Sequence, residues 1–441
     1  MNRLSFSDVL LSVVSVVVTC EAIAPAARIG VSSLFWWIVL FFTFLIPYGK
    51  VIIGFCDECG YGSSLYVWIK KSMGLRWAGR ITWYYWVNYV SWFTSVAVLF
   101  SSILNFILGY KLSPFTQSFT SIIFVACVYL IGSVGVCSSK RIINLGAISK
   151  ILIAITLGVF GIYFGLINGF ELKSTRDFVE DISSLTVLSQ LSIILFNYMG
   201  LEVIASFGDR VSDPKMHVQK AIMVGGLAVC TIYLLSSFGI IVNCGDQNIS
   251  SELGIVKTVG IMFENDVVVD IISILFMIAL YTSMVSWIMG VSIEIRGAAL
   301  NKVFPKAFSL GNINGEPVGA MLITSMVVCV LLLVRGFIPN STDFFELVFS
   351  LNIVFALLSY VPMFFGYYRL RTTITNNFLN SVDIFSLVVL PIGELVISVI
   401  LSIWPVVDGN LDTKKISLLI LTILLVVAGE ILERRCYSRY S

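Results

Sequence analysis

Long hydrophobic segments, separated by short polar loops, dominate the pattern of this chain. About 20 consecutive apolar residues are enough to cross a bilayer as an α-helix, and twelve segments reach roughly that length. They are expected at residues 6–29, 34–56, 81–108, 116–137, 141–168, 184–208, 218–243, 266–295, 318–338, 343–368, 382–405 and 414–432. The pattern predicts an all-α polytopic membrane protein with about twelve transmembrane helices, which form a single domain over residues 1–441.

Composition supports this class and narrows the chemistry. Of the 441 residues, 58% are hydrophobic and 12% are charged, whereas soluble domains carry about 25% charged residues. The net charge of +2 gives no reason to expect a nucleic-acid partner. One histidine, His217, expected in a loop, and one CxxC pair, Cys56 with Cys59, are too few ligands for a zinc site. We expect no metal, no cofactor and no enzymatic activity.

Lysine and arginine decide the expected orientation, because cytoplasmic loops of membrane proteins are enriched in them. They gather in alternate loops, above all around residues 57–80 and 209–220, on the side that the first residues also occupy. The pattern predicts that both termini are cytoplasmic and that the chain is a multi-pass protein of the cell membrane. The stretch 57–80, in which Lys70 and Lys71 lie near two tryptophans, is expected to lie along the membrane interface.

The sixth segment carries polar residues where a membrane helix would be apolar. Asn197, Gly200 and Glu202 fall in its middle. A carboxylate in the bilayer costs at least ~2.5 kcal/mol on insertion scales, so it usually faces a cavity or a partner. Glycine weakens the helix at that point. Two interpretations stay open: an unwound helix that binds a substrate or ion, or a glycine-softened helix whose Glu202 bonds to a neighbouring helix.

The first segment is interrupted in a similar way by Glu21 and Pro25. Proline removes a helical hydrogen bond and is tolerated in the first turn of a new helix. We expect a break near Cys20 to Ala24 and an outer half-helix starting near Pro25, and a simple proline kink is the alternative. Interrupted helices at corresponding positions of two halves are typical of inverted-repeat transporters. The expected repeats are 6–168 and 184–368, with peripheral helices at 382–432.

Several motifs resemble those of the amino acid–polyamine–organocation superfamily of permeases, and most closely its bacterial glutamate:GABA antiporter-like members. The matching stretches are Glu21–Ala24, Tyr66–Lys70, Phe196–Gly200 with Glu202, Asp213–Lys215 and Ser286–Gly290. The chain departs from the superfamily pattern at Arg210, where an acidic residue is more usual, and after Gly290, where a proline is more usual.

The resemblance implies a LeuT-type fold with five-plus-five inverted repeats and two peripheral helices. It also implies a secondary active transporter that moves an amino acid by alternating access. The substrate would lie against the unwound strips, with its carboxylate on half-helix amides. The implied substrate-binding residues are Thr19, Cys20, Glu21, Ala22, Ile23, Ala24, Phe196, Asn197, Tyr198, Met199 and Gly200, with Asn88, Trp92 and Trp287 as wall residues.

Lys150 is the expected coupling residue. It lies in apolar sequence of the fifth segment, and burial in such surroundings disfavours the charged amine. In proton-coupled members of the superfamily a lysine on this helix stands where sodium binds in sodium-coupled relatives, and Lys150 resembles it. Its expected partners in proton coupling are Glu21, Glu202, Ser283 and Ser286.

Three alternatives to proton-coupled amino acid transport stay open. Exchange of one amino acid or amine for another needs no net proton movement, and Lys150 would then pair structurally with a carboxylate of the first helix. A channel would need a continuous polar pore, and a membrane-embedded transferase would need paired acidic motifs on cytoplasmic loops. The expected partners are a small-molecule substrate, protons and the lipid bilayer, and the sequence does not set the oligomeric state.

Overall fold

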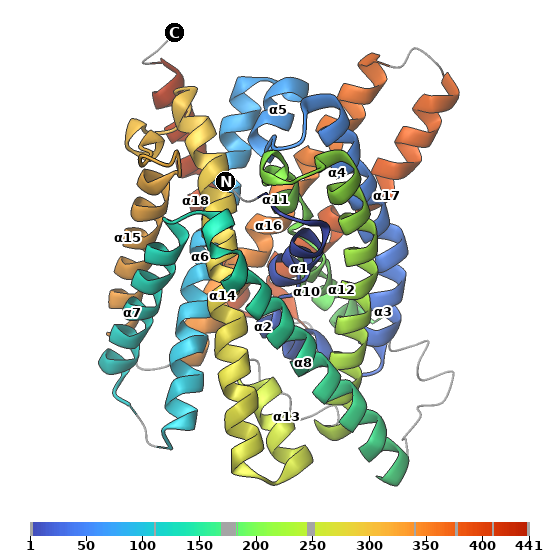
Figure 1. The fold of residues 1–441 in the computed structure, drawn as a ribbon, viewed down its shortest axis with the longest axis vertical. Coiled ribbons are helices and arrows are strands. Elements are labelled where there is room, and N and C mark those ends of the chain that lie inside the picture. The colour runs from blue at the N-terminus through green and yellow to red at the C-terminus, as the bar shows by residue number, and fades with distance from the viewer. Residues whose placement is uncertain are drawn as a thin grey trace.

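The computed structural model describes residues 3–109, 112–168, 182, 184–244, 252–338, 341–374, 378–407 and 410–438, and helices make up most of them (Figure 1). The helices of the first half are α1 (Phe6–Val17), α2 (Cys20–Ala27), α3 (Ser32–Leu40), the π-helix η1 (Phe41–Leu45), α4 (Ile46–Cys59), α5 (Leu65–Met73), α6 (Leu75–Ile107), α7 (Pro114–Gly132) and α8 (Val136–Asn168). Those of the second half are α10 (Leu185–Asn197), α11 (Leu201–Ser206), the 3-10 helix η2 (Gly208–Arg210), α12 (Pro214–Cys244), α13 (Gly254–Phe263), α14 (Asp266–Leu300), the 3-10 helix η3 (Lys306–Ser309), α15 (Val318–Arg335), α16 (Ser341–Ile374), α17 (Phe378–Ile403) and α18 (Thr413–Ser438).

The all-helical class is confirmed. Ten helices of the described ranges are long and apolar enough to cross a membrane, and the bent pair α1–α2 makes an eleventh span. The remaining expected segment, 382–405, coincides with α17, whose apolar stretch Leu387–Ile403 is shorter. Two short strands, β1 (Val406–Val407) and β2 (Asn410–Leu411), pair antiparallel between α17 and α18. The division into two inverted repeats stays a prediction.

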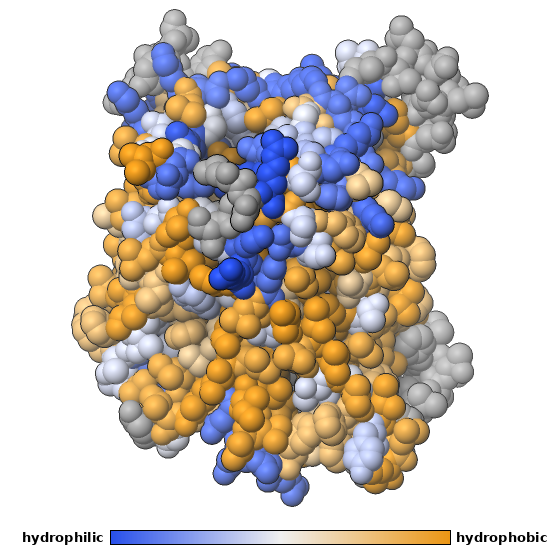
Figure 2. All heavy atoms as spheres, viewed as in Figure 1, coloured by the Kyte–Doolittle hydropathy of each residue, from blue (hydrophilic) through white to orange (hydrophobic). Residues whose placement is uncertain are grey.

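Apolar residues cover the middle of the face shown in Figure 2. Large apolar side chains such as Leu166, Met223 and Ile397 are exposed, as expected of a surface that contacts lipid. Hydrophilic residues gather at the upper end, near α5, and both marked chain ends lie in the upper half of the view (Figures 1 and 2). This arrangement is compatible with termini on one side of the membrane, and their cytoplasmic location stays a prediction.

A buried carboxylate fixes the short helix α5 at the upper end. Glu294, near the end of α14, accepts hydrogen bonds from the backbone amides of Leu65 (2.9 Å) and Tyr66 (2.7 Å). These are first-turn amides of α5, which have no partner within the helix. The bonds tie the stretch that is expected to lie along the interface to the long helix α14.

Small residues allow α8 and α12 to pack closely beside the broken helices. A Cβ atom on Gly161 would lie 2.5 Å from the Gly239 Cα atom, and one on Gly239 would lie 2.1 Å from the Leu157 carbonyl oxygen. No larger side chain fits at either position, as is common where membrane helices cross. The contact positions α8 and α12, which supply two side chains of the candidate site.

Candidate functional site

The first helix break lies between α1 and α2, which bend by 49° relative to each other. Val18 is extended and Thr19 is non-helical, and α2 begins at Cys20. The expected position was wrong by a few residues, because Cys20 to Ala24 are helical and Pro25 lies inside α2. Pro25 removes only one hydrogen bond, that to the Glu21 carbonyl, and α2 tolerates the loss. The position of the break is set instead by side chains that bond the carbonyls freed at the end of α1.

Those carbonyls are fully bonded by three neighbouring helices. Lys150 Nζ of α8 donates to the Ser15 carbonyl (2.5 Å) and to the Val18 carbonyl. Trp287 Nε1 of α14 donates to the Val16 carbonyl (2.9 Å). The Tyr233 hydroxyl of α12 donates to the Val17 carbonyl (2.8 Å). Lipid supplies no partner for an unwound backbone, so these side chains stabilise the break.

The surroundings of Lys150 differ in part from those expected. Its side chain is 1% exposed, and its hydrogen bonds go to carbonyls of α1 rather than to a carboxylate. The Ser283 hydroxyl also approaches the Ser15 carbonyl (3.4 Å), so this expected neighbour is close. Ser286 donates to the Thr282 carbonyl of its own helix (3.0 Å). Lys150 therefore stabilises the C-terminal end of α1, where the break begins.

The second break lies between α10 and α11. Phe196 and Asn197 complete α10, whereas the sequence predicted that they would be unwound, and the non-helical residues are Tyr198 to Gly200. Gly200 has a φ of +114°, which side chains other than hydrogen rarely allow. A Cβ atom there would lie 2.8 Å from Trp287 Cζ2. Conformation and space therefore both require glycine at the second break.

Asn197 and Tyr233 join the two breaks. The Thr19 hydroxyl donates to Asn197 Oδ1, and Asn197 Nδ2 donates to the Ala22 carbonyl (3.4 Å). The Tyr233 hydroxyl also lies 2.9 Å from the Asn197 carbonyl and accepts from the Thr19 amide at 2.9 Å. The breaks thus form one hydrogen-bonded unit rather than two separate kinks.

Glu21 and Glu202 occupy equivalent positions, because each is the second residue of its half-helix. The positive end of a helix dipole favours a carboxylate there. Trp92 Nε1 donates to Glu21 Oε1 (2.6 Å), and the backbone N–H of Glu21 also donates to that carboxylate. Glu202 accepts from three tyrosine hydroxyls, those of Tyr360 (2.7 Å), Tyr48 and Tyr85.

Aromatic rings connect the two carboxylates. Trp92 lies edge-on to Trp287, with ring centroids 5.0 Å apart, and Trp287 lies 6.2 Å from Tyr85. Trp92 bonds Glu21, and Tyr85 bonds Glu202. A continuous row of contacting groups therefore crosses the site, in the order carboxylate, indole, indole, phenol and carboxylate. Cation–π attraction at such rings adds to the attraction of the carboxylates for a cation.

The other expected site residues lie close to the breaks but differ in what they offer. Cys20, Ile23 and Ala24 are part of the buried core around α2, as Met199 is around the second break. The Tyr198 hydroxyl donates away from the break, to the Trp37 carbonyl (2.7 Å). Asn88 is buried in α6, and its Oδ1 atom has no hydrogen-bond partner among the described residues.

Sequence reasoning missed four tyrosines of this region and one buried amide on α16. They are Tyr48, Tyr85, Tyr233, Tyr360 and Asn352, all buried. Both side-chain polar atoms of Asn352 lack a partner among the described residues. An isolated amide in an apolar membrane segment was the available signal for Asn352. The tyrosines gave no signal, because this residue is also common as packing at membrane interfaces.

A cavity of about 580 Å³ opens beside α2, α10, α16 and α18. Its lining includes Pro25, Ile193 and Phe349 together with Asp343, Glu346, Lys414 and Lys415. Phe349 contacts Phe196 (ring centroids 6.2 Å apart), which in turn contacts Trp92 (5.9 Å). Glu21, Trp92 and Trp287 are each at most 4% exposed, so these rings separate the site from the cavity.

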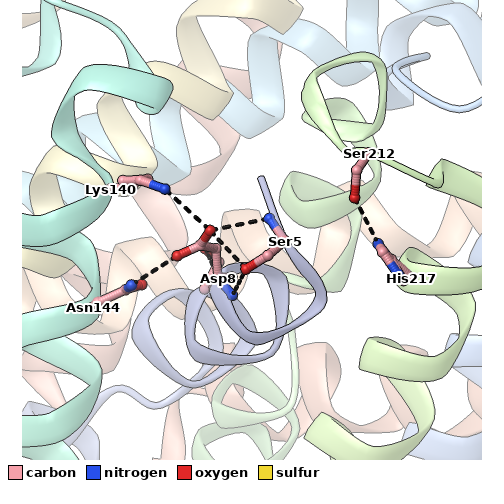
Figure 3. A network of polar contacts seen from close by, with 7 residues as sticks. Ser5, Asp8, Lys140, Asn144, Ser212 and His217 are labelled. Atoms are coloured by element: carbon pink, nitrogen blue, oxygen red, sulfur yellow. Dashed lines mark hydrogen bonds and ion pairs between the residues drawn. The ribbon is translucent and has the colours of Figure 1, made fainter. Parts of the chain in front are cut away.

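Polar contacts tie the start of the chain to α8 (Figure 3). Asp8 of α1 accepts from Asn144 Nδ2 (3.0 Å) and pairs with Lys140 Nζ (3.4 Å), both on α8. Leu4 forms a β-bridge with Val211. His217 contacts the Ser212 hydroxyl (3.1 Å). The sequence predicted that His217 lies in a loop, but it lies in the first turn of α12.

Comparisons with known proteins agree with this architecture. Residues 4–428 match the family model described as amino acid permease. The chain is 34% identical to the probable agmatine/putrescine antiporter AguD of Lactococcus lactis, over 98% of this chain and 95% of that protein. It is 21% identical to a glutamate/gamma-aminobutyrate antiporter of Lactococcus lactis, over 69% and 63% of the two chains.

A solved manganese transporter of Eremococcus coleocola shares the fold with a TM-score of 0.58 at 12% identity, over 98% of this chain and 94% of that one. The match identifies the LeuT-type fold that the sequence motifs implied. At this level of identity it says nothing about the substrate.

Proposed function

This chain belongs to the amino acid permease family, whose members are secondary transporters, and from that premise we propose that it exchanges small cationic amines across the cell membrane. The row of contacting side chains from Glu21 to Glu202, in the order carboxylate, indole, indole, phenol and carboxylate, carries this proposal. A molecule with a cationic group at each end and an apolar chain between them matches this order of groups. The similarity to a probable agmatine/putrescine antiporter supports the same class, because both of those molecules carry two cationic ends.

The N-terminus of α2 also favours an amine over an amino acid. The resemblance implied that the amides of this half-helix bind a substrate carboxylate. Glu21 supplies a carboxylate of its own there, bonded by its backbone N–H and by Trp92. A second anion beside Glu21 would be repelled, whereas an ammonium group would be attracted. We therefore place the cationic end of the substrate, rather than a carboxylate, at the first break.

Lys150 supports exchange as the mode of transport. Its ammonium group bonds two carbonyls at the C-terminal end of α1, where the break begins. A cation fixed in this position stabilises the break as a bound ion would, but it is not itself transported. One substrate can therefore be exchanged for another without a co-transported ion. The antiporters among the similar proteins are consistent with this mode.

Proton coupling is the second candidate, and the burial of Lys150 favours it. The side chain is 1% exposed, and such surroundings disfavour the charged amine. Loss of the proton would weaken the bonds to the Ser15 and Val18 carbonyls and release the break. A pH gradient would then drive uptake, whereas pure exchange would ignore the gradient.

The route to the site follows from the contacts already described. Substrate would enter the cavity beside α16, pass Phe349 and Phe196, and reach Trp92 and Glu21. Movement past Glu202 would require its three tyrosine partners to separate. In the present structure Phe349 packs on Phe196 and all three tyrosines bond Glu202, so both barriers are closed.

A ligand-binding test separates the substrate classes. The purified protein is heated with putrescine, a monoamine of similar length, glutamate or buffer, because a ligand that binds only the folded state raises stability. We expect the largest shift with putrescine, and expect Glu21→Gln and Glu202→Gln each to reduce it towards that of the monoamine. Glu430→Gln is the matched control, since Glu430 pairs with Arg80 away from the site (2.6 Å). A larger shift with glutamate would reject the cationic class.

A further inference from the structure

Two buried amide side chains, Asn88 of α6 and Asn352 of α16, have polar atoms that bond nothing in the described part of the chain. Asn88 is 3% exposed and Asn352 is 0% exposed. The unbonded atoms are Asn88 Oδ1 and both polar atoms of Asn352, Oδ1 and Nδ2. Buried side-chain amides in proteins nearly always have a hydrogen-bond partner, so each of these two calls for an explanation.

Ring contacts between α6 and α16 place the two amides at the same depth. The helices pack on each other, and Tyr84 of α6 contacts Phe355 of α16, with ring centroids 5.9 Å apart. Further along α6, Trp92 contacts Phe196, which in turn contacts Phe349, a residue earlier in α16. The two helices therefore run antiparallel here. Each amide lies between the two contacts on its own helix, so both occupy the same level.

The face of α6 that carries Asn88 is the face that borders the substrate site. Asn88 lies three residues after Tyr85 and four residues before Trp92. Those two side chains bond the carboxylates at the two ends of the site. Residues three or four apart share one face of a helix, so Asn88 lies midway between the two ends.

Asn352 is directed towards the same place from α16. It lies three residues after Phe349, which contacts Phe196 beside the site, and three residues before Phe355, which contacts α6. Its side chain therefore lies between the direction of the site and the direction of α6. Two unbonded amides thus meet at the middle of the row of groups that connects the two carboxylates.

The surroundings of the amides favour a cationic N–H group as their partner. Carboxylates close both ends of the row, and aromatic rings line it. Such surroundings attract a cation and repel an anion. The Oδ1 atoms of Asn88 and Asn352 are acceptors. The methylene chain of a simple diamine would leave both oxygens unbonded, whereas an N–H group within the chain would donate to them.

Building on the amine exchange proposed above, we propose that Asn88 and Asn352 form a hydrogen-bonding subsite that selects substrates with an N–H group inside the chain. Two kinds of amine provide such a group. Guanidino amines such as agmatine have an inner guanidine N–H, and triamines such as spermidine have a central ammonium. Asn352 Nδ2, the remaining unbonded atom, would donate to Asn88 Oδ1, because a carbonyl oxygen accepts two hydrogen bonds.

Titration calorimetry of the purified protein with length-matched ligands tests this subsite. Agmatine is compared with hexamethylenediamine, and spermidine with octamethylenediamine, because the two ligands of each pair have the same number of atoms between their end nitrogens. Since hydrogen bonds from charged groups are strong, we expect at least one N–H ligand to bind about tenfold more tightly than its matched diamine. The pair that shows this preference identifies the kind of N–H group that the subsite binds.

Two leucine variants separate selection from structural damage. Asn352→Leu and Asn88→Leu should each raise the Kd of the N–H ligand to that of its matched diamine, and should leave the Kd of the diamine unchanged or lower it. Structural damage would weaken both ligands of a pair. Both variants are expected to fold, because an apolar side chain of similar shape replaces an unbonded amide. Ser359→Ala is the matched control, since Ser359 is also buried in α16 but bonds the Phe355 carbonyl of its own helix (2.7 Å).

The outcomes distinguish this subsite from the amine site as a whole. Equal affinities within both pairs in the wild type would overturn the subsite and leave the amine site standing. A preference that persists in either folded leucine variant would do the same. If the wild type binds none of the four cations, the proposed function fails, and the subsite fails with it.

Discussion

Replacing Gly200 by alanine tests whether the second helix break is built into the fold. The backbone φ of +114° is unfavourable for any residue with a Cβ atom, and holding one in such a region costs roughly 1–3 kcal/mol. The new methyl group would also lie 2.8 Å from Trp287 Cζ2 and 3.3 Å from Val16 Cγ1. Trp287 cannot withdraw freely, because its Nε1 atom bonds the Val16 carbonyl (2.9 Å). We expect Gly200→Ala to lower stability and to displace the indole that connects the two ends of the site.

Two assays measure these effects. Heat denaturation followed by size-exclusion chromatography should show a lower denaturation midpoint for Gly200→Ala. Exchange of labelled putrescine should fall at least tenfold if displacement of the indole weakens the binding free energy by about 1.4 kcal/mol or more. Gly226→Ala is the matched control. Gly226 lies in α12, and a Cβ atom added there would lie no closer than 3.7 Å to any neighbouring atom. Wild-type stability and exchange in Gly200→Ala would refute the requirement for glycine at this break.

Three further substitutions probe the first break. Lys150→Met leaves two carbonyls of α1 without their donor, at about 1–3 kcal/mol for each buried group, so both the denaturation midpoint and exchange should fall; normal exchange would show that the cation is dispensable. Trp92→Phe removes the indole N–H from Glu21 and should weaken putrescine binding by about tenfold in a competition assay, since hydrogen bonds to charged groups contribute about 1.5–3 kcal/mol; unchanged affinity would remove Trp92 from the site. Pro25→Ala should bind putrescine like the wild type, because Pro25 lies inside α2 and does not form the break; a large loss would restore the proline as its cause.

The sequence predicted the fold well because membrane helices are encoded in long apolar segments. All twelve expected segments coincide with helices or broken helix pairs. The two breaks were also expected, since Glu21 and Glu202 are costly in lipid and so indicate a polar interior. What the sequence located poorly was the position of the first break. Pro25 gave a local signal, but the break depends on Lys150 and Tyr233 from distant helices.

The candidate site was predictable only in part, for a related reason. Backbone carbonyls form much of it, and every residue has one, so a sequence cannot indicate which carbonyls are free. The three tyrosines around Glu202 come from α4, α6 and α16, and only the packing of those helices brings them together. Lys150 was identified from its isolation in apolar sequence, although its partners proved to be carbonyls.

The central claim is that this transporter exchanges diamines through a site between Glu21 and Glu202. The most direct test is uptake of labelled putrescine into proteoliposomes that contain either unlabelled putrescine or buffer alone, without a pH gradient. The account predicts rapid uptake only into vesicles loaded with putrescine, and loss of this stimulation in Glu21→Gln. Equal uptake into loaded and empty vesicles, or full stimulation in Glu21→Gln, would contradict it.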